Sequence, residues 1–448
     1  MIGKSPNQSQ GDLFRPLLTD FMDMNHELVL LAHKLDWVSI ESGLSVYYSK
    51  VGQPSVPIRL MVGCLILKHL YNHGDESLAK VWVMNPYMQY FCGEAHFQHR
   101  FPFNPSDFVH FRHRIGEEGV NLIFRQSVLL HGKSAKEPVV LSDTTVQGNH
   151  TTYPTDAKLY KKIIDQCNRM ADKYGLEVRQ SYKRVSKQLL RDTYNSNHPK
   201  RKKSTAKARG KLHTIAGRMV RELERILPDY ERMLHQYDLS LFHQVLSQEV
   251  KDSHKIYSLH KPYTDCIAKG KSQKPYEFGN KVGFLITSKS LIITAIRTFT
   301  KNPNDGRTIE PLINELDRNQ FKRPQEVVYD RAAKGVKPIG EVKVSVPSKP
   351  LKADSTYQKQ KKRKKFRRRA AIEPVNAHLK SDFRMQENFL LGDCYIQLNA
   401  LLSAAAWNFK KWMKKIISWL WKIVQDIGTL RQYWQLARRR EPVFTPIS

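Results

Sequence analysis

Three carboxylate residues, Asp143, Asp330 and Glu373, stand where an acidic side chain could have a chemical role. Asp143 lies inside the apolar, β-branched run VVLSDTTV, where a buried charge is costly unless it is paired or binds a metal. Asp330 ends the run EVVYD, at the kind of position where α/β sheets bind ligands. Carboxylates suit Mg²⁺, so two or three of them could support metal-dependent attack on a phosphodiester.

The cations around Glu373 suggest how such a site could hold an anionic substrate. In RRRAAIEPVNAHLK, helical spacing places Arg369, Glu373 and Lys380 on nearly one face. The alternative is an exposed helix with i,i+4 ion pairs, which contribute little stability. Pro374 directly follows the glutamate, so we expect a helix start or a kink there.

The overall charge indicates a polyanionic partner. The 448 residues contain 74 Lys and Arg against 42 Asp and Glu, a net charge of +32, which favours nucleic acid over a membrane surface. Five scattered cysteines argue against a disulfide framework or zinc cluster. The polar N-terminus and short apolar runs predict a cytoplasmic, nucleoid-associated protein with no membrane partner.

The elements that must position these residues read as an α/β domain. Runs rich in β-branched residues predict a mixed five-stranded sheet that starts antiparallel and continues through a crossover helix at 307–319. The predicted strands are 138–146, 281–288, 290–300, 326–330 and 341–347. Residues 395–415 form a strongly apolar helix that is more typical of a core than of a base-stacking surface.

Residues 21–130 read as short helices, the last of them basic. In NPSDFVHFRHRIG an apolar face of Phe108, Phe111 and Ile115 leaves Arg112 and Arg114 pointing elsewhere, as DNA-binding candidates. The region fits either a helix-turn-helix-like DNA-binding unit or an ordinary helical domain with a solvated basic face.

A long, mostly helical and basic insertion separates the first two strands. Its centre, 197–211, predicts a flexible basic tip between two antiparallel helices, which either contacts DNA or is a solvated loop. A second basic run, 361–369, leads directly into the helix of Glu373, which argues against a disordered tail or a localisation signal.

These segments together resemble the DDE-type transposases of bacterial insertion sequences. The spacing R-x3-E-x6-K, here Arg369, Glu373 and Lys380, resembles the family signature. VLSDTTVQGNHTTYPTDAKL and VVYDRAAKG are similar to the segments that carry the family's two aspartates. The family has a tyrosine three residues before the arginine, and this chain has Phe366 there.

The resemblance implies a ribonuclease-H-like catalytic core with Asp143, Asp330 and Glu373 as metal-binding catalytic residues. It implies two Mg²⁺ ions, with Mn²⁺ possible, and DNA ends and target DNA as partners. Arg369 and Lys380 would position phosphates. Water would cut at the element's ends, and the freed 3′-hydroxyls would attack target DNA, with the protein acting as a homodimer on DNA. Asp305, in the turn NPNDGRT, is a rival for the second aspartate.

The expected organisation has three parts. Residues 1–130 form a helical N-terminal DNA-binding domain, and 131–425 form the catalytic domain, interrupted by the helical basic insertion at 155–270. Residues 426–448 form a C-terminal tail. Two other functions remain open: a non-catalytic or domesticated DNA-binding regulator derived from a transposase, and another ribonuclease-H-like nuclease, which the long insertion and the signature spacing disfavour.

Overall fold

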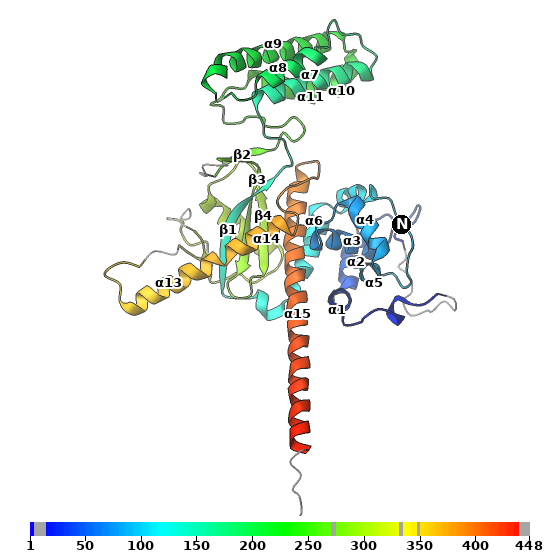
Figure 1. The fold of residues 1–448 in the computed structure, drawn as a ribbon, viewed down its shortest axis with the longest axis vertical. Coiled ribbons are helices and arrows are strands. Elements are labelled where there is room, and N and C mark those ends of the chain that lie inside the picture. The colour runs from blue at the N-terminus through cyan, green and yellow to red at the C-terminus, as the bar shows by residue number, and fades with distance from the viewer. Residues whose placement is uncertain (4–14, 197, 270–274, 331–334, 347–349, 439–448) are drawn as a thin grey trace, which may run out of the picture.

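A six-stranded mixed sheet forms the centre of the molecule (Figure 1). The computed structural model describes residues 1–3, 15–196, 198–269, 275–330, 335–346 and 350–438, with only the helical backbone described for 419–438. The strands are β1 (Val139–Gly148), β2 (Asp265–Ala268), β3 (Tyr276–Thr287), β4 (Ile293–Phe299), β5 (Glu326–Val328) and β6 (Lys343–Ser345).

The strand order confirms the predicted hairpin and crossover but corrects the number of strands. β3 pairs antiparallel with β1 on one edge, and with β2 and β4 on the other. β1, β5 and β6 are parallel, so the chain crosses over through α12 (Ile309–Arg318). The prediction of five strands was wrong, because β2 lies in a segment expected to belong to the helical insertion. The arrangement is consistent with a ribonuclease-H-like core.

The two faces of the sheet are covered by different helices. Successive side chains of a strand point to opposite faces, so Leu141 and Val328 join one core and Val140 and Val327 the other. Helices α14 (Ile372–Ser381) and α15 (Cys394–Arg438) contribute to the core of the first face, and α12 covers the second. This alternation decides which residues can meet above the sheet.

The described part of the N-terminal region contains mainly helices, and it shares its core with the sheet. The buried residues of its helices form one hydrophobic cluster with α15 and the first sheet face. Gly116, at φ 55° and ψ −159°, is not helical and divides the longest of these elements into two helical parts at a kink. The helices are α1 (Glu27–Lys34), α2 (Trp37–Ser45), α3 (Ile58–Leu70), α4 (Asp75–Met84), α5 (Pro86–Phe91) and α6 (Asp107–Leu129).

The insertion is a separate helical bundle rather than a two-helix hairpin with a flexible tip. It has its own hydrophobic core and stands apart from the sheet (Figure 1). Residue 197 lies outside the described residues, but most of the expected tip is ordered, since 199–201 form a 3₁₀ turn and a long helix begins at Lys202. The helices are α7 (Asp156–Lys173), α8 (Lys183–Asp192), α9 (Lys202–Ile226), α10 (Asp229–Leu234) and α11 (Gln236–Ser247).

The C-terminal third contains the basic helix α13 (Thr356–Ala370), followed by α14 and α15. The predicted start of a tail at 426 falls inside α15, which continues to Arg438, and residues 439–448 lie outside the described part. Within the described residues no helix has the length and apolar character needed to cross a membrane. Other 3₁₀ turns are Leu18–Asp20, Gly132–Ala135 and Asp305–Thr308.

Candidate active site

The register of two parallel strands brings Asp143 and Asp330 to the same place. Leu141 of β1 pairs with Val328 of β5, and each aspartate follows its strand's paired residue by two positions. A separation of two keeps a side chain on the same face, so both aspartates project toward the face that α14 covers. The two residues are thus neighbours in space because of strand pairing, although most of the α/β region separates them in the sequence.

Glu373 approaches the same face from a helix that starts beside it. The basic helix α13 ends at Ala370, and α14 begins at Ile372, which puts Glu373 in its first turn. Pro374 occupies the third helical position, where its missing N–H has no intrahelical partner to lose. The expected helix start is confirmed. Arg369 and Glu373 consequently lie on different helices, and the prediction of one continuous helix face was wrong.

Arg369 lies between the three carboxylates. Its guanidinium nitrogens are 3.8 Å from Oδ1 of Asp143, 3.8 Å from Oδ2 of Asp330 and 3.8 Å from Oε1 of Glu373. These separations are ion pairs rather than hydrogen bonds, and the buried Nε of Arg369 has no hydrogen-bond partner among the described residues. One cation therefore offsets part of the negative charge of three acids, at ion-pair distance from each of them.

The environment of Asp143 makes its charged form less favourable than it is in water. Burial raises the pKa of Asp143 to about 6, with smaller raising effects from Asp330 and Asp305. The backbone N–H of Thr144, which donates to Oδ1 at 2.9 Å, and the charge of Arg369 both oppose that rise. A buried carboxylate of this kind is typical of a functional site.

The donor chemistry of this cluster fits a divalent cation, provided that Arg369 gives way. The side chains offer only carboxylate oxygens, the ligands that Mg²⁺ prefers, and they already surround one positive charge. As they stand, no three or more His, Cys, Asp or Glu side chains in the described ranges are grouped closely enough to hold a metal ion. The three acids converge on a guanidinium rather than on each other.

Asp305, the rival aspartate, lies nearby with partners of its own. Its Oδ1 accepts hydrogen bonds from Lys281 Nζ at 2.7 Å and from Thr144 Oγ1 at 3.0 Å. It is close enough to raise the pKa of Asp143. In this arrangement Asp305 holds Thr144 and Lys281 beside the cluster, whereas Asp330 contacts Arg369 directly.

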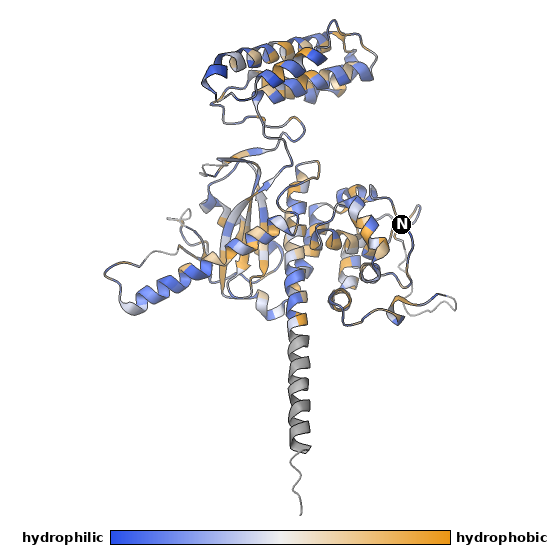
Figure 2. Cartoon of the chain, viewed as in Figure 1, coloured by the Kyte–Doolittle hydropathy of each residue, from blue (hydrophilic) through white to orange (hydrophobic). Residues whose placement is uncertain are grey.

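A basic groove lies along α13, and none of the three acids lines it. A cavity of about 1100 Å³ lies between this helix and strands β1 and β5 of the sheet, and six cations line it together with Glu326. The helix is almost uniformly hydrophilic and extends away from the sheet, on the side opposite the N-terminal helices (Figure 2). Lys365 pairs with Glu326 of β5, which ties the helix to the sheet, whereas Lys362 pairs with Asp354 in the turn that precedes the helix. The cations are Lys289, Lys361, Lys364, Lys365, Arg367 and Arg368.

The other predicted DNA-binding residues lie in different settings. Lys380 is half-buried in the last turn of α14, two turns beyond Glu373. Arg114 is exposed and lies over the ring of Tyr48, with the guanidinium carbon 4.7 Å from the ring centre. Arg112 does not point to solvent as expected. It is 3 % exposed, and its guanidinium donates two hydrogen bonds to Asp75.

Two family models match this chain. The model described as "Transposase domain (DUF772)" matches residues 16–114, and the "Transposase DDE domain" model matches residues 251–409. The chain belongs to the DDE transposases of insertion sequences. Asp330 and Glu373 fall inside the second match. Asp143 lies outside both matches, so strand pairing is what associates it with the other two acids.

One relative is similar over a substantial part of its length. "Uncharacterized protein ORF8 in nfe locus" of Rhizobium meliloti is 38 % identical over 187 residues, which cover 41 % of this chain and 90 % of that protein. No solved structure is significantly similar to this chain.

Sequence reasoning missed the contact of Arg369 with both aspartates and the partnership of Arg112 with Asp75. The family spacing relates Arg369 to Glu373 only, and no local pattern relates it to β1 or β5. Arg112 lies four residues after Phe108, which places both side chains on the same face of a helix. This spacing indicated that Arg112 is buried on the apolar face. An arginine in that position needs a carboxylate partner, which Asp75 provides.

Proposed function

We propose that this transposase cuts DNA at the ends of its insertion sequence and joins the freed ends to target DNA, with Asp143, Asp330 and Glu373 as its catalytic residues. The observation that carries the proposal is the convergence of these acids around Arg369, in the last turn of the basic helix α13. Bound Mg²⁺ would activate the attacking oxygen and stabilise the leaving one.

The chain's own residues supply the positions and the charge. Asp143 stands on β1, and Asp330 lies two residues beyond the end of its partner strand β5, so the sheet holds the two acids near each other before DNA arrives. The cations of α13 would bind the phosphate backbone and direct one phosphodiester toward the three acids. In this role Arg369 leaves the carboxylates and turns to a DNA phosphate, while Lys380 contacts a phosphate further along α14.

Joining two ends requires two active sites to be held together, so we expect the protein to act as a homodimer on DNA. The α9 helix offers a further DNA contact, since its buried side has helical spacing while its cations face outward. Arg114, exposed at the surface of α6, remains a candidate DNA contact of the N-terminal region.

The experiment that tests the proposal is a cleavage assay with Mg²⁺ on a duplex carrying the element's end and its flanking DNA. Wild-type protein should cut the duplex and release a 3′-hydroxyl, and the Glu373→Gln variant should bind but not cut it. Wild-type protein that binds the duplex without cutting it in Mg²⁺ or Mn²⁺ would instead favour the non-catalytic regulator.

A further inference from the structure

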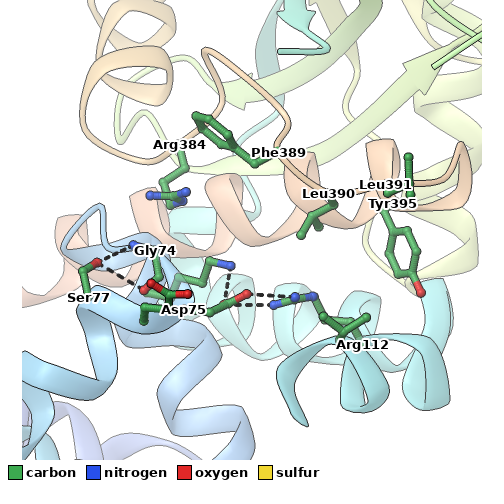
Figure 3. A pocket seen from close by; sticks show the side chains of 12 residues that line it. Gly74, Asp75, Ser77, Arg112, Arg384, Phe389, Leu390, Leu391 and Tyr395 are labelled. Atoms are coloured by element: carbon green, nitrogen blue, oxygen red, sulfur yellow. Dashed lines mark hydrogen bonds and ion pairs between the residues drawn. The ribbon is translucent and has the colours of Figure 1, made fainter. Parts of the chain in front are cut away.

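A cavity of about 720 Å³ lies between the N-terminal helices and the segment that follows α14 (Figure 3). One wall comes from α3, α4 and α6, and the other from residues 384–395. The two walls belong to the two segments matched by different transposase models. None of the proposed catalytic residues lines this cavity.

The floor of the cavity is a buried network of two cations and one carboxylate. Lys68 is 5 % exposed and donates to Oδ1 of Asp75 at 2.6 Å, and Arg112 donates to both oxygens of Asp75 at 3.1 and 3.0 Å. Burial, together with the neighbouring charge of Arg112, lowers the pKa of Lys68 to about 8. A single carboxylate, that of Asp75, thus forms ion pairs with two buried cations, so the floor carries excess positive charge.

Arg384 adds a third cation above this floor. Its side chain points into the cavity toward Asp75 (Figure 3). Its hydrogen-bond partners are the neutral oxygens of Asn72, at 3.3 and 3.4 Å, and within the described ranges no carboxylate lies at ion-pair distance from it. The other acid of the lining, Glu76, is exposed. Among the described residues, this cation therefore has no ion-pair partner, and Asp75 acts on it only at longer range.

The backbone at Arg384 is held in an unfavourable conformation. Its φ is 65°, in the left-handed region that residues other than glycine rarely adopt. Its carbonyl accepts a hydrogen bond from Asn399 Nδ2 at 3.0 Å, and Asn72 Nδ2 donates to the carbonyl of Ser381 at 3.0 Å. The surrounding structure thus maintains a strained residue whose side chain faces a cavity, which is typical of binding sites.

The rim of the cavity is apolar and open to solvent. Phe389 is 55 % exposed and Leu391 58 % exposed. The guanidinium carbon of Arg384 lies 5.5 Å from the ring centre of Phe389. A ligand that fits this cavity has an anionic group for the cations and a flat or apolar part for the rim.

We infer that this cavity is a nucleotide-binding subsite for transposon-end DNA, in which Arg384 contacts a backbone phosphate and Phe389 and Leu391 contact the adjoining sugar and base. The inference rests on the proposed function, because it places the same DNA substrate across both sites. Lys68 and Arg112 supply positive charge from below, and Asp75 holds them in place. Arg384 and Phe389 are positioning residues rather than catalytic ones.

Helix α14 sets the distance between this subsite and the carboxylates. Glu373 lies in its first turn and Ser381 ends it, a rise of roughly 12 Å at 1.5 Å per residue. That length equals about three to four base pairs of DNA. The phosphate bound by Arg384 should therefore lie roughly three to four nucleotides from the bond that is cut.

The test measures binding of the full chain, in EDTA, to duplexes that carry the element's terminal sequence and one neutral methylphosphonate each. The proteins are wild type, Arg384→Gln, and the charge-matched control Arg323→Gln, whose guanidinium is already paired with Asp317. Arg384→Gln should weaken binding to unmodified DNA roughly tenfold and reduce the salt dependence by about one phosphate contact. The control should bind like wild type.

The position of the modified phosphate gives the decisive result. At one position, three to four nucleotides from the cut, the methylphosphonate should weaken wild-type binding and leave Arg384→Gln unaffected. Phe389→Ala, a change of an exposed side chain, should weaken binding without altering the salt dependence, and it serves in place of Arg384→Gln should that variant not fold.

The inference would be overturned if the methylphosphonate weakened binding by the same factor in wild type and in Arg384→Gln at every position. It would also be overturned if Arg384→Gln bound DNA as tightly as the control. Such an outcome, with Mg²⁺-dependent cleavage by wild-type protein intact, would leave the proposed function standing. Wild-type protein that neither binds nor cuts the end duplex would overturn both.

Discussion

Arg369 Nη2 lies 3.8 Å from Oδ1 of Asp143, so the last turn of the basic helix contacts the central strand of the sheet. The same guanidinium lies at the same distance from carboxylate oxygens of Asp330 and Glu373. Three acids that would repel each other at neutral pH are in this way held together by one cation. The relationship ties the proposed DNA contact to the proposed metal site through a single side chain.

The proposed catalytic residues predict a specific pattern of loss. Asp143→Asn, Asp330→Asn and Glu373→Gln should each reduce Mg²⁺-dependent cleavage of end DNA below detection, since each removes a charged oxygen ligand. Binding of the same duplex in EDTA should remain near wild type. Cleavage is read on a denaturing gel, and binding by fluorescence anisotropy.

Asp305→Asn provides the matched comparison for the second aspartate. Asp305 pairs with Lys281 and Thr144, so its loss should reduce cleavage less than the loss of Asp330. If Asp305→Asn abolishes cleavage and Asp330→Asn does not, the assignment of Asp330 is incorrect.

Replacing Arg369 should lower the stability of the metal-free protein and increase the stabilisation that Mg²⁺ provides. Arg369→Gln leaves the acids without their shared cation, which should lower the free energy of unfolding in EDTA by about 1 kcal/mol. Added Mg²⁺ should raise the melting temperature of this variant more than that of wild type. Differential scanning fluorimetry across a Mg²⁺ titration measures both effects.

The same variant tests the proposed DNA role of Arg369. Strand transfer should slow by about 100-fold or more, because a positioned cation near the reacting phosphate is lost. Lys380→Gln should slow strand transfer as well, without changing the response to Mg²⁺. Equal Mg²⁺-induced stabilisation of wild type and Arg369→Gln would argue against competition between Arg369 and metal for the acids.

His69 predicts how stability depends on pH. The ring is buried between α3 and α15, with Nε2 3.2 Å from Oδ1 of Asn399. Burial, together with the charge of Lys68, lowers the pKa of His69 to about 3. Below its ordinary pKa of 6.5 the unfolded chain therefore binds a proton that the folded chain excludes, so stability falls as pH falls. This group should remove about 2 kcal/mol between about pH 7.5 and pH 5.

Thermal unfolding across that pH range measures the effect. His69→Gln should flatten the loss of stability on acidification, whereas the exposed control His198→Gln should keep the wild-type slope. A wild-type slope in His69→Gln would mean that other buried groups, such as His131, dominate acid destabilisation.

The cations of α9 predict a contribution to DNA binding by the insertion. Replacing the exposed Lys202, Lys203, Lys207 and Arg209 with glutamine should weaken binding and reduce the salt slope by up to about four units. The pair Arg218 and Arg221, exposed on the other half of the helix, is the control for a general charge effect. An equal loss of DNA affinity per removed charge in both variants would show that only the net charge of the protein affects binding.

Much of the α/β organisation could be predicted because local patterns encode it. The β-branched runs predicted β1, the β3–β4 hairpin, β5 and β6, and the periodic segments predicted α12 and the N-terminal helices. β2 was missed because four residues carry too little pattern. The basic segment 197–211 was read as a loop, although Thr205, Ala208 and the following Leu212 repeat at helical spacing and are buried, Leu212 in the insertion's core.

The sequence by itself determined the residue types of the candidate site. It supplied three acids in α/β surroundings, a basic helix before Glu373, and a helix start marked by Pro374. The tertiary structure alone decided which of these groups meet. Pairing of Leu141 with Val328 aligns Asp143 with Asp330, and packing of α14 on that sheet face brings Arg369 between the acids. Long-range contacts of this kind, like that of Arg112 with Asp75, leave no local pattern, because they depend on how distant elements pack.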